Sequence, residues 1–155
     1  MLNKPFFLSI LFVLVFISCS KDSTDNNSLT TSNKEIEAKL FTLVNQHRES
    51  LGILPLEQSK VAQQYAEEHT LYMVTTEDLS HSNFQERAKA ISAKTNANYI
   101  AENIASNYDT AEQVMLNWLQ SSDHKANLEG EYTHTGISVM HKQDGNYYFT
   151  QLFYK

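Results

Sequence analysis

ISVMHKQDGNYYFTQLF, residues 137–153, is the stretch that decides the fold of this chain. In its first part Ile137 and Val139 alternate with more polar neighbours, which is the two-residue period of a β-strand. Asp144-Gly145 suits a tight hairpin turn. The run from Tyr147 to Phe153 is again rich in residues that favour strands. The stretch therefore predicts an antiparallel hairpin at the C-terminal end.

Upstream of the hairpin, apolar residues recur at the three- and four-residue spacing of amphipathic helices. The elements expected there are helices from Glu35 to about Gly52, over 58–73, from about Asn83 and from Thr110, and a strand over 99–104. Ser82 with Gln85, and Thr110 with Gln113, fit capping boxes at two of these helix starts. Helices followed by a terminal hairpin predict an α+β fold, in which helices pack against an antiparallel sheet.

Size and charge limit the classes of function. A chain of 155 residues has room for one domain, and we expect a monomer. Its formal net charge of −6 repels phosphate backbones, so nucleic acid is not an expected partner. The same charge argues against electrostatic binding to anionic membranes. Cys19 is the single cysteine, so the sequence after it offers no disulfide and no thiolate.

The N-terminus resembles the leader of a bacterial lipoprotein. Lys4 precedes an apolar run over residues 6–17, which is too short for a spanning helix of ~20 residues and is typical of a signal peptide. Ser18-Cys19 at the end of that run resembles a lipobox. We therefore expect residues 1–18 to be a lipoprotein signal peptide and Cys19 to be acylated. The alternative is a plain signal peptide with an incidental cysteine.

Residues 19–33 are expected to be a flexible tether between the acylated cysteine and a globular domain at 34–155. Leu29 is the only large apolar residue of this segment, which cannot bury enough surface to order itself. These features predict a protein of the cell envelope, held at the outer membrane through Cys19. Residues 20–23 resemble a short export tag of lipoproteins that reach the cell surface. The alternative to a periplasmic location is therefore that the protein is exposed on the cell surface.

Several segments of the domain together resemble one family. They are Leu43–Arg48, Gly52–Leu56, Leu79–His81, Ala101–Ala105, Val114–Leu128 and Tyr132–Ile137. In this order they look like the bacterial branch of the CAP superfamily, named for cysteine-rich secretory proteins, antigen 5 and pathogenesis-related proteins. The resemblance covers about residues 35–155. It implies a three-layer α-β-α sandwich with the antiparallel sheet in the middle.

The resemblance also implies a cavity lined by histidine and glutamate. His81 and Glu102 match the family's first His/Glu pair, and His124 matches a histidine in the bacterial Ser-x-x-His pattern. The second glutamate of eukaryotic members has no clear equivalent, so chemistry that needs two glutamates is not implied. The residues expected to support the three side chains from behind are Asn103, Ser121 and Asp123.

Each of these residues also has a plain structural interpretation. On a strand, Glu102 shares a face with Ile100 and Ile104, where a carboxylate needs a partner; hydrogen bonds from loop backbone would suffice. His81 lies before a predicted helix start, whose positive end favours the neutral imidazole that a ligand or general base requires. Without the resemblance it would be a turn histidine, and His124 a surface histidine.

The other polar residues of interest have simpler predicted roles. His47, His69 and His141 are expected to be solvated or to lie at the edge of the core. His134 lies one or two positions away from the family pattern. Asn45 and Arg48, which are a helical turn apart, are expected to tie the first helix to neighbouring loops.

Two imidazoles and a carboxylate in one cleft have two usual uses. They can bind a divalent metal such as zinc, or a histidine and a carboxylate can act as base and orienting group. Three hypotheses follow. The first is an envelope binding module whose cleft holds a metal and an extracellular ligand. The second is a hydrolase acting on peptidoglycan or protein, with Glu102 and His81 as base and acid and His124 as a further catalytic candidate, and the third is a lipid or sterol carrier. The first is favoured and the second is close behind.

Overall fold

The computed structural model describes residues 30–143 and 145–155. The predicted signal peptide, Cys19, most of the predicted tether and Asp144 of the predicted turn lie outside the described residues. Five helices and five strands are described: β1 Thr30–Ser32, α1 Lys34–Ser50, β2 Glu57–Gln58, α2 Lys60–Thr76, α3 Phe84–Thr95, β3 Ile100–Ser106, α4 Ala111–Gln120, α5 Ser122–Glu129, β4 His134–Lys142 and β5 Tyr147–Tyr154.

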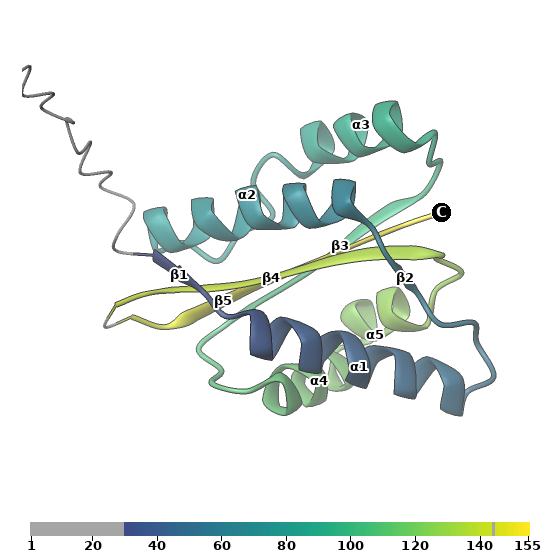
Figure 1. Ribbon diagram of the computed structural model, residues 1–155, viewed down its shortest axis with the longest axis horizontal. Coiled ribbons are helices and arrows are strands. Elements are labelled where there is room, and N and C mark those ends of the chain that lie inside the picture. The colour runs from purple at the N-terminus through teal and green to yellow at the C-terminus, as the bar shows by residue number, and fades with distance from the viewer. Residues whose placement is uncertain (1–29, 144) are drawn as a thin grey trace, which may run out of the picture.

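The elements form three layers, as the family resemblance implied (Figure 1). Helices α2 and α3 cover one face of the sheet, and α1, α4 and α5 cover the other. The strand order is β1-β4-β5-β3, with β2 pairing β4 in addition. The predicted hairpin is confirmed, because β4 and β5 pair antiparallel from His134↔Tyr154 to His141↔Tyr147. Along this path β3 is the outer strand opposite β1.

The core lies on both faces of the sheet. Trp118 and Phe153 belong to the larger cluster, under α1, α4 and α5. The indole Nε1–H of Trp118 donates to the carbonyl of Ile104, 3.2 Å away, which ties α4 to β3. A smaller cluster around Ala66 and Ile91 fills the face under α2 and α3. Strand β3 is therefore held from both sides, and this strand carries Glu102.

The helix starts confirm one predicted capping box and correct the other. At α4, Thr110 accepts from the backbone of Gln113, and the Gln113 side chain reaches back to the cap. At α3 the cap is Asn83 in the left-handed conformation, with no side-chain cap bond, so the box predicted from Ser82 and Gln85 is wrong. The Ser82 hydroxyl is 2.9 Å from that of Ser80 instead.

The folded domain begins earlier than predicted. The tether was expected to reach residue 33, but Thr30–Ser32 forms β1 and pairs antiparallel with β4. Asn33 then caps α1 by accepting from the amide of Ile36. The physical reason is the open edge of β4, whose unpaired backbone groups hold even a polar segment. Within the described part of the chain, no helix is long and apolar enough to cross a membrane.

Candidate functional site

Glu102 is the centre of a buried polar cluster. It lies on β3 and its side chain is almost fully buried, on the face covered by α2 and α3. Arg87 of α3 holds both of its carboxylate oxygens, with Nε donating to Oε2 at 2.9 Å and Nη2 lying 2.8 and 2.7 Å from Oε1 and Oε2. The remaining guanidinium nitrogen donates to the carbonyl of Ser82 at 2.6 Å. The predicted need of Glu102 for a partner is thus met by an arginine and not by loop backbone.

His81 is held by the same carboxylate. Its Nδ1 is 2.8 Å from Oε1 of Glu102, and because a carboxylate only accepts, Nδ1 carries the proton. About half of the His81 side chain is exposed, while Glu102 beneath it is 1% exposed. The described residues offer no hydrogen bond to the Nε2 of His81. Nε2 is therefore the nitrogen of His81 through which a ligand could be bound.

His69 belongs to this cluster, although it was predicted to be solvated or at the edge of the core. It is 2% exposed and stacks on Tyr72, with ring centroids 5.9 Å apart. Its Nε2–H donates to the carbonyl of Ser80 at 2.8 Å, and the same nitrogen lies 3.8 Å from Oε1 of Glu102. Burial lowers the pKa of His69, so the ring is neutral at pH 7. His69 thus ties α2 to the loop that carries His81.

His124 lies on the other side of β3, in the first turn of α5. Its ring is beside Trp118, with centroids 6.2 Å apart. Its Nδ1 is buried and has no hydrogen-bond partner among the described residues. Burial, and then the nearby charge of His81, lower the pKa of His124. Both histidines lie next to β3, His81 through Glu102 and His124 through Asn103.

Two adjacent residues of β3 contact the two histidines of the site. Glu102 and Asn103 point to opposite faces, as neighbours on a strand must. Glu102 binds His81, while the amide of Asn103 donates to the carbonyl of His124 at 3.0 Å. Asn127 supports Asn103 by donating to its side-chain oxygen at 2.8 Å. The expected supporting role of Asn103 therefore acts on the backbone of His124.

The other two expected supporting residues act less directly. Ser121 precedes α5, and its carbonyl accepts from the amide of Lys125 at 2.9 Å. The charge of Asp123 raises the pKa of His124, as the weakest of three influences. Among the described residues, neither side chain hydrogen-bonds to the His124 ring. His134 lies elsewhere, stacked on Tyr154 with ring centroids 4.7 Å apart.

Sequence reasoning missed Arg87, although a signal for it was present. A carboxylate on an apolar strand face requires a cation, and the chain has only two arginines. The other, Arg48, donates to the carbonyls of Leu54 and Leu128 among others, as predicted for a residue that ties α1 to loops. Arg87 was therefore the arginine still without a role.

The arrangement limits how a metal could bind. In the described part of the chain, no group of three or more His, Cys, Asp or Glu side chains is placed to hold a metal ion. Arg87 and His81 already occupy the oxygens of Glu102. Nε2 of His81 and Nδ1 of His124 have no hydrogen-bond partner among the described residues, and they are the nitrogens that could bind a cation.

Comparison with known proteins gives both a family and a fold. A sequence model of CAP, the cysteine-rich secretory protein family, matches residues 41–153. No curated protein matches the sequence. Among solved structures, the chain is similar to an outer surface protein from Borrelia burgdorferi, with a TM-score of 0.74 and 22% identity over 81% of this chain and 96% of that one.

Two further bacterial structures have the same fold. One is an extracellular protein containing an SCP domain from Bacillus anthracis, with a TM-score of 0.67 and 23% identity over 79% of this chain and 41% of that one. The other is a cysteine-rich secretory protein from Staphylococcus aureus, with a TM-score of 0.64 and 20% identity over 79% of this chain and 38% of that one. This chain thus spans less than half of either protein.

Proposed function

The chain belongs to the CAP, or cysteine-rich secretory protein, family, and we propose that it is an envelope binding module whose cleft takes up a divalent metal ion such as Zn²⁺. His81 and His124 would be the protein ligands. The observation that carries the proposal is the buried Nδ1 of His124, which has no partner among the described residues. A buried polar atom without a partner is costly, and a bound cation would remove that cost.

Two features of the histidines favour metal binding, which requires neutral imidazole. Burial lowers the pKa of His124 and keeps its ring neutral at pH 7. Glu102 accepts from Nδ1 of His81, so Nε2 is the nitrogen of that ring that would bind the ion. A carboxylate behind a histidine ligand fixes its tautomer and orientation in many metal sites.

Glu102 supports the site without being a ligand. It was predicted as one of three ligands, together with the two histidines. Its contacts with Arg87 at 2.7–2.9 Å favour an orienting role instead, because a metal bound to it would have to displace the guanidinium. In this proposal Arg87 holds Glu102, Glu102 holds His81, and His81 faces the solvent.

Two imidazoles leave most of a metal's coordination sphere to water or to an extracellular ligand. Structural zinc sites have four protein ligands and catalytic sites usually three, so we expect weaker and exchangeable binding here. When bound, the ion would supply a Lewis acid at the surface of the cleft. An extracellular ligand with a carboxylate or carbonyl oxygen would complete the coordination.

Calorimetry of the purified chain with ZnCl₂ tests the metal site. We expect saturable binding that His81→Ala and His124→Ala each weaken by at least about tenfold. His141→Ala is the matched control, because this histidine lies on β4 and contacts Tyr147. Equal affinity in wild type and in both site variants would contradict the proposal.

Attachment to the envelope is the second part of the proposal. The apolar run over residues 6–17, followed by Ser18-Cys19, supports a lipid anchor at the outer membrane. The outer surface and extracellular proteins of the same fold are consistent with that location. Cys19→Ala should abolish incorporation of radiolabelled palmitate and release the protein from the membrane fraction. A variant that stays labelled and membrane-bound would contradict the lipoprotein interpretation.

Hydrolysis is a second candidate because of one observation, the exposed His81 ring on a buried carboxylate. A histidine with Nδ1–H bound to a carboxylate and a solvent-facing Nε2 has the geometry of a general base. His81 would then be the base and Glu102 its orienting group. Incubation with peptidoglycan sacculi or with casein, followed by mass spectrometry of the products, tests this candidate. Fragments that also appear with His81→Ala would exclude His81 as the base.

A further inference from the structure

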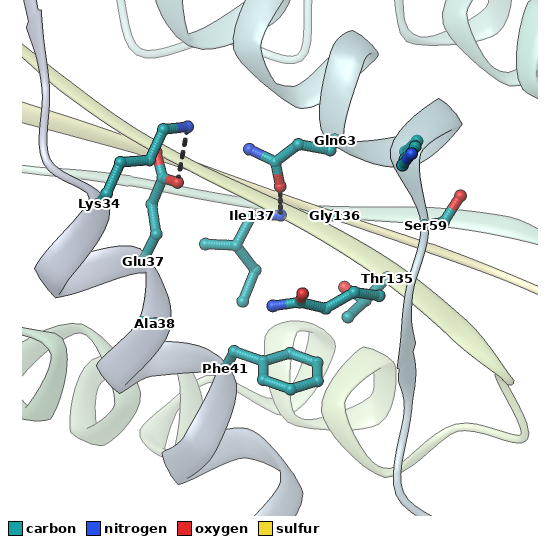
Figure 2. A pocket seen from close by; sticks show the side chains of 11 residues that line it. Lys34, Glu37, Ala38, Phe41, Ser59, Gln63, Thr135, Gly136 and Ile137 are labelled. Atoms are coloured by element: carbon teal, nitrogen blue, oxygen red, sulfur yellow. Dashed lines mark hydrogen bonds and ion pairs between the residues drawn. The ribbon is translucent and has the colours of Figure 1, made fainter.

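A cleft lies at the opposite edge of the sheet from His81. It has a volume of about 420 Å³ and is bounded by the first two turns of α1, the start of α2 and the outer edge of β4 (Figure 2). Its volume is within the range of small-ligand pockets. None of its lining residues contributes to the histidine site.

The floor of this cleft is a short gap in the pairing of β4. β5 pairs with one edge of β4 along its length. On the other edge β1 pairs with residues 140–142 and β2 with residues 134–135, so among the described residues the positions between them have no partner strand on that edge. Two side chains take the place of a partner strand there by accepting hydrogen bonds from the backbone of β4. The amide of Ile137 donates to Oε1 of Gln63 at 3.1 Å, as Figure 2 shows, and the amide of Val139 donates to Oε1 of Glu37 at 3.1 Å.

The carbonyl of Ile137 is the unmatched group of this gap. The N–H and C=O of one strand residue point to the same side, so this carbonyl faces the cleft together with the amide that binds Gln63. The carbonyl of Val139 accepts from Asn33, and that of Thr135 accepts from Ser59. The described residues supply no donor to the carbonyl of Ile137. Because buried backbone groups are almost always paired, it calls for a donor from outside.

Lys60 is the ammonium at the cleft that can pair with an anion. Lys34 is matched twice, by Glu37 at 3.0 Å and by Glu67 at 2.8 Å. Lys60 also lines the cleft, and within the described residues no carboxylate lies within 4.0 Å of its ammonium. The charges of Lys34, Lys60, Glu37 and Glu67 cancel, so a carboxylate would be held here by Lys60 itself and not by an excess of positive charge.

The cleft also has an apolar wall, made by Ala38, Phe41 and Ile137, and the Phe41 ring is directed into the opening (Figure 2). One ligand matches all three features: a main-chain N–H for the carbonyl of Ile137, a carboxylate for Lys60, and an apolar side chain for the wall. We propose that this cleft binds the C-terminal end of an extended peptide. β1 and β2 close the gap on both sides, so a chain end fits where a long strand would not. The peptide N–H adds one rung to the sheet, as in β-strand addition.

NMR titration of the ¹⁵N-labelled chain tests the proposal with three related dipeptides. Acetyl-Ala-Leu with a free carboxylate should give saturable shifts at the amides of Lys60, Gln63 and Ile137. The C-terminal amide of this dipeptide lacks the charge, and the N-methyl-leucine form lacks the donor. We expect each to bind at least about fivefold more weakly. Hexanoate, which has a carboxylate but no N–H, should bind as weakly as the N-methyl form.

Variants of the cleft distinguish specific binding of a peptide C-terminus from nonspecific binding. Ala38→Phe should fill the opening and abolish the shifts without disturbing the fold, because Ala38 is exposed. Lys60→Met should remove the difference between free acid and amide. Lys89→Met, an exposed lysine on α3, is the matched control and should bind as wild type does. The proposal is overturned by the absence of saturable shifts, by equal affinity for acid and amide, or by hexanoate binding as tightly as the peptide.

Discussion

The two arginines of this protein, Arg48 and Arg87, are both buried, with 1% and 9% of their surface exposed, but they have different roles. Arg48 has only neutral partners: its guanidinium donates to four backbone carbonyls, of Leu54, Leu128, Gly130 and Tyr132. Arg87 instead neutralises a carboxylate, Glu102, which in turn holds an exposed histidine. Arg48 therefore joins parts of the fold, while Arg87 sets the chemistry of a site.

The difference shows that the role of a buried arginine depends on whether its partners are neutral or charged. A buried cation whose donors all meet carbonyls does not fix the charge of a neighbouring side chain, and burial lowers the pKa of Arg48 because no anion compensates it. A cation that pairs with a carboxylate keeps that carboxylate ionised and in a fixed position. The carboxylate can then orient its other hydrogen-bond partner. In this chain that partner is His81. The contrast predicts separate outcomes when each arginine is removed.

The largest loss of stability is expected from Arg48→Met. The substitution keeps the apolar stem but leaves four carbonyls without their donor, and each buried group left unpaired costs ~1–3 kcal/mol. Relaxation and water entry reduce the total, so we expect the free energy of unfolding in urea to fall by about 3–5 kcal/mol. A loss below about 1 kcal/mol would contradict the joining role. Zinc affinity of the remaining folded protein should not change.

Arg87→Met should cost less stability but should also weaken zinc binding. It leaves Glu102 as a buried, unpaired charge, which typically costs about 3–5 kcal/mol unless another group relieves it. His81 can give partial relief, so about 2–4 kcal/mol is expected. The double variant Arg87→Met/Glu102→Leu should regain part of the stability and none of the zinc affinity. If it regained zinc affinity, Glu102 would have no orienting role.

A smaller effect is expected from pH, because burial lowers the pKa of His69. The unfolded chain then binds its proton more readily than the folded protein does. The free energy of unfolding should therefore fall as the pH drops below the ordinary pKa of 6.5, with no contribution from His69 above it. His69→Gln keeps a donor for Ser80 and cannot titrate there. Urea unfolding between pH 7.5 and 5 should show a shallower loss in this variant than in wild type.

The smallest effect is expected from an exposed ion pair. Lys155 and Glu131 lie 2.8 Å apart with the Glu131 side chain 91% exposed, so solvent screens their attraction. Glu131→Gln should leave the melting temperature unchanged within error. A clear loss would show that charge pairing in this protein does not depend on burial, and the contrast between the two arginines would lose its basis.

Much of the fold could be predicted from local patterns. Alternation from Ile137 and the β-rich run from Tyr147 correctly predicted the hairpin, and Thr110 with Gln113 correctly predicted the start of α4. The box at Ser82 was wrong because α3 begins one residue later, after Asn83, and Ser82 instead contacts Arg87 through its carbonyl and Ser80 through its hydroxyl. β1 was missed because its strand character comes from the open edge of β4.

The site was only partly predictable. The resemblance named His81, Glu102 and His124, and the contact between the first two is present. Arg87 could have been assigned only by elimination between the two arginines, because its partner Glu102 lies 15 residues away. His69 could not be assigned, because only packing brings it to the carbonyl of Ser80, 11 residues away.

What the sequence by itself determined is the periodicity of each element, the overall charge and the presence of an apolar run before a single cysteine. These depend on neighbours along the chain. Only the tertiary structure decided that β3 is an edge strand, with Glu102 and Asn103 holding histidines on opposite faces, and that Ile137 is left with an open carbonyl. Both depend on which strands pair, and pairing is settled by packing between distant segments.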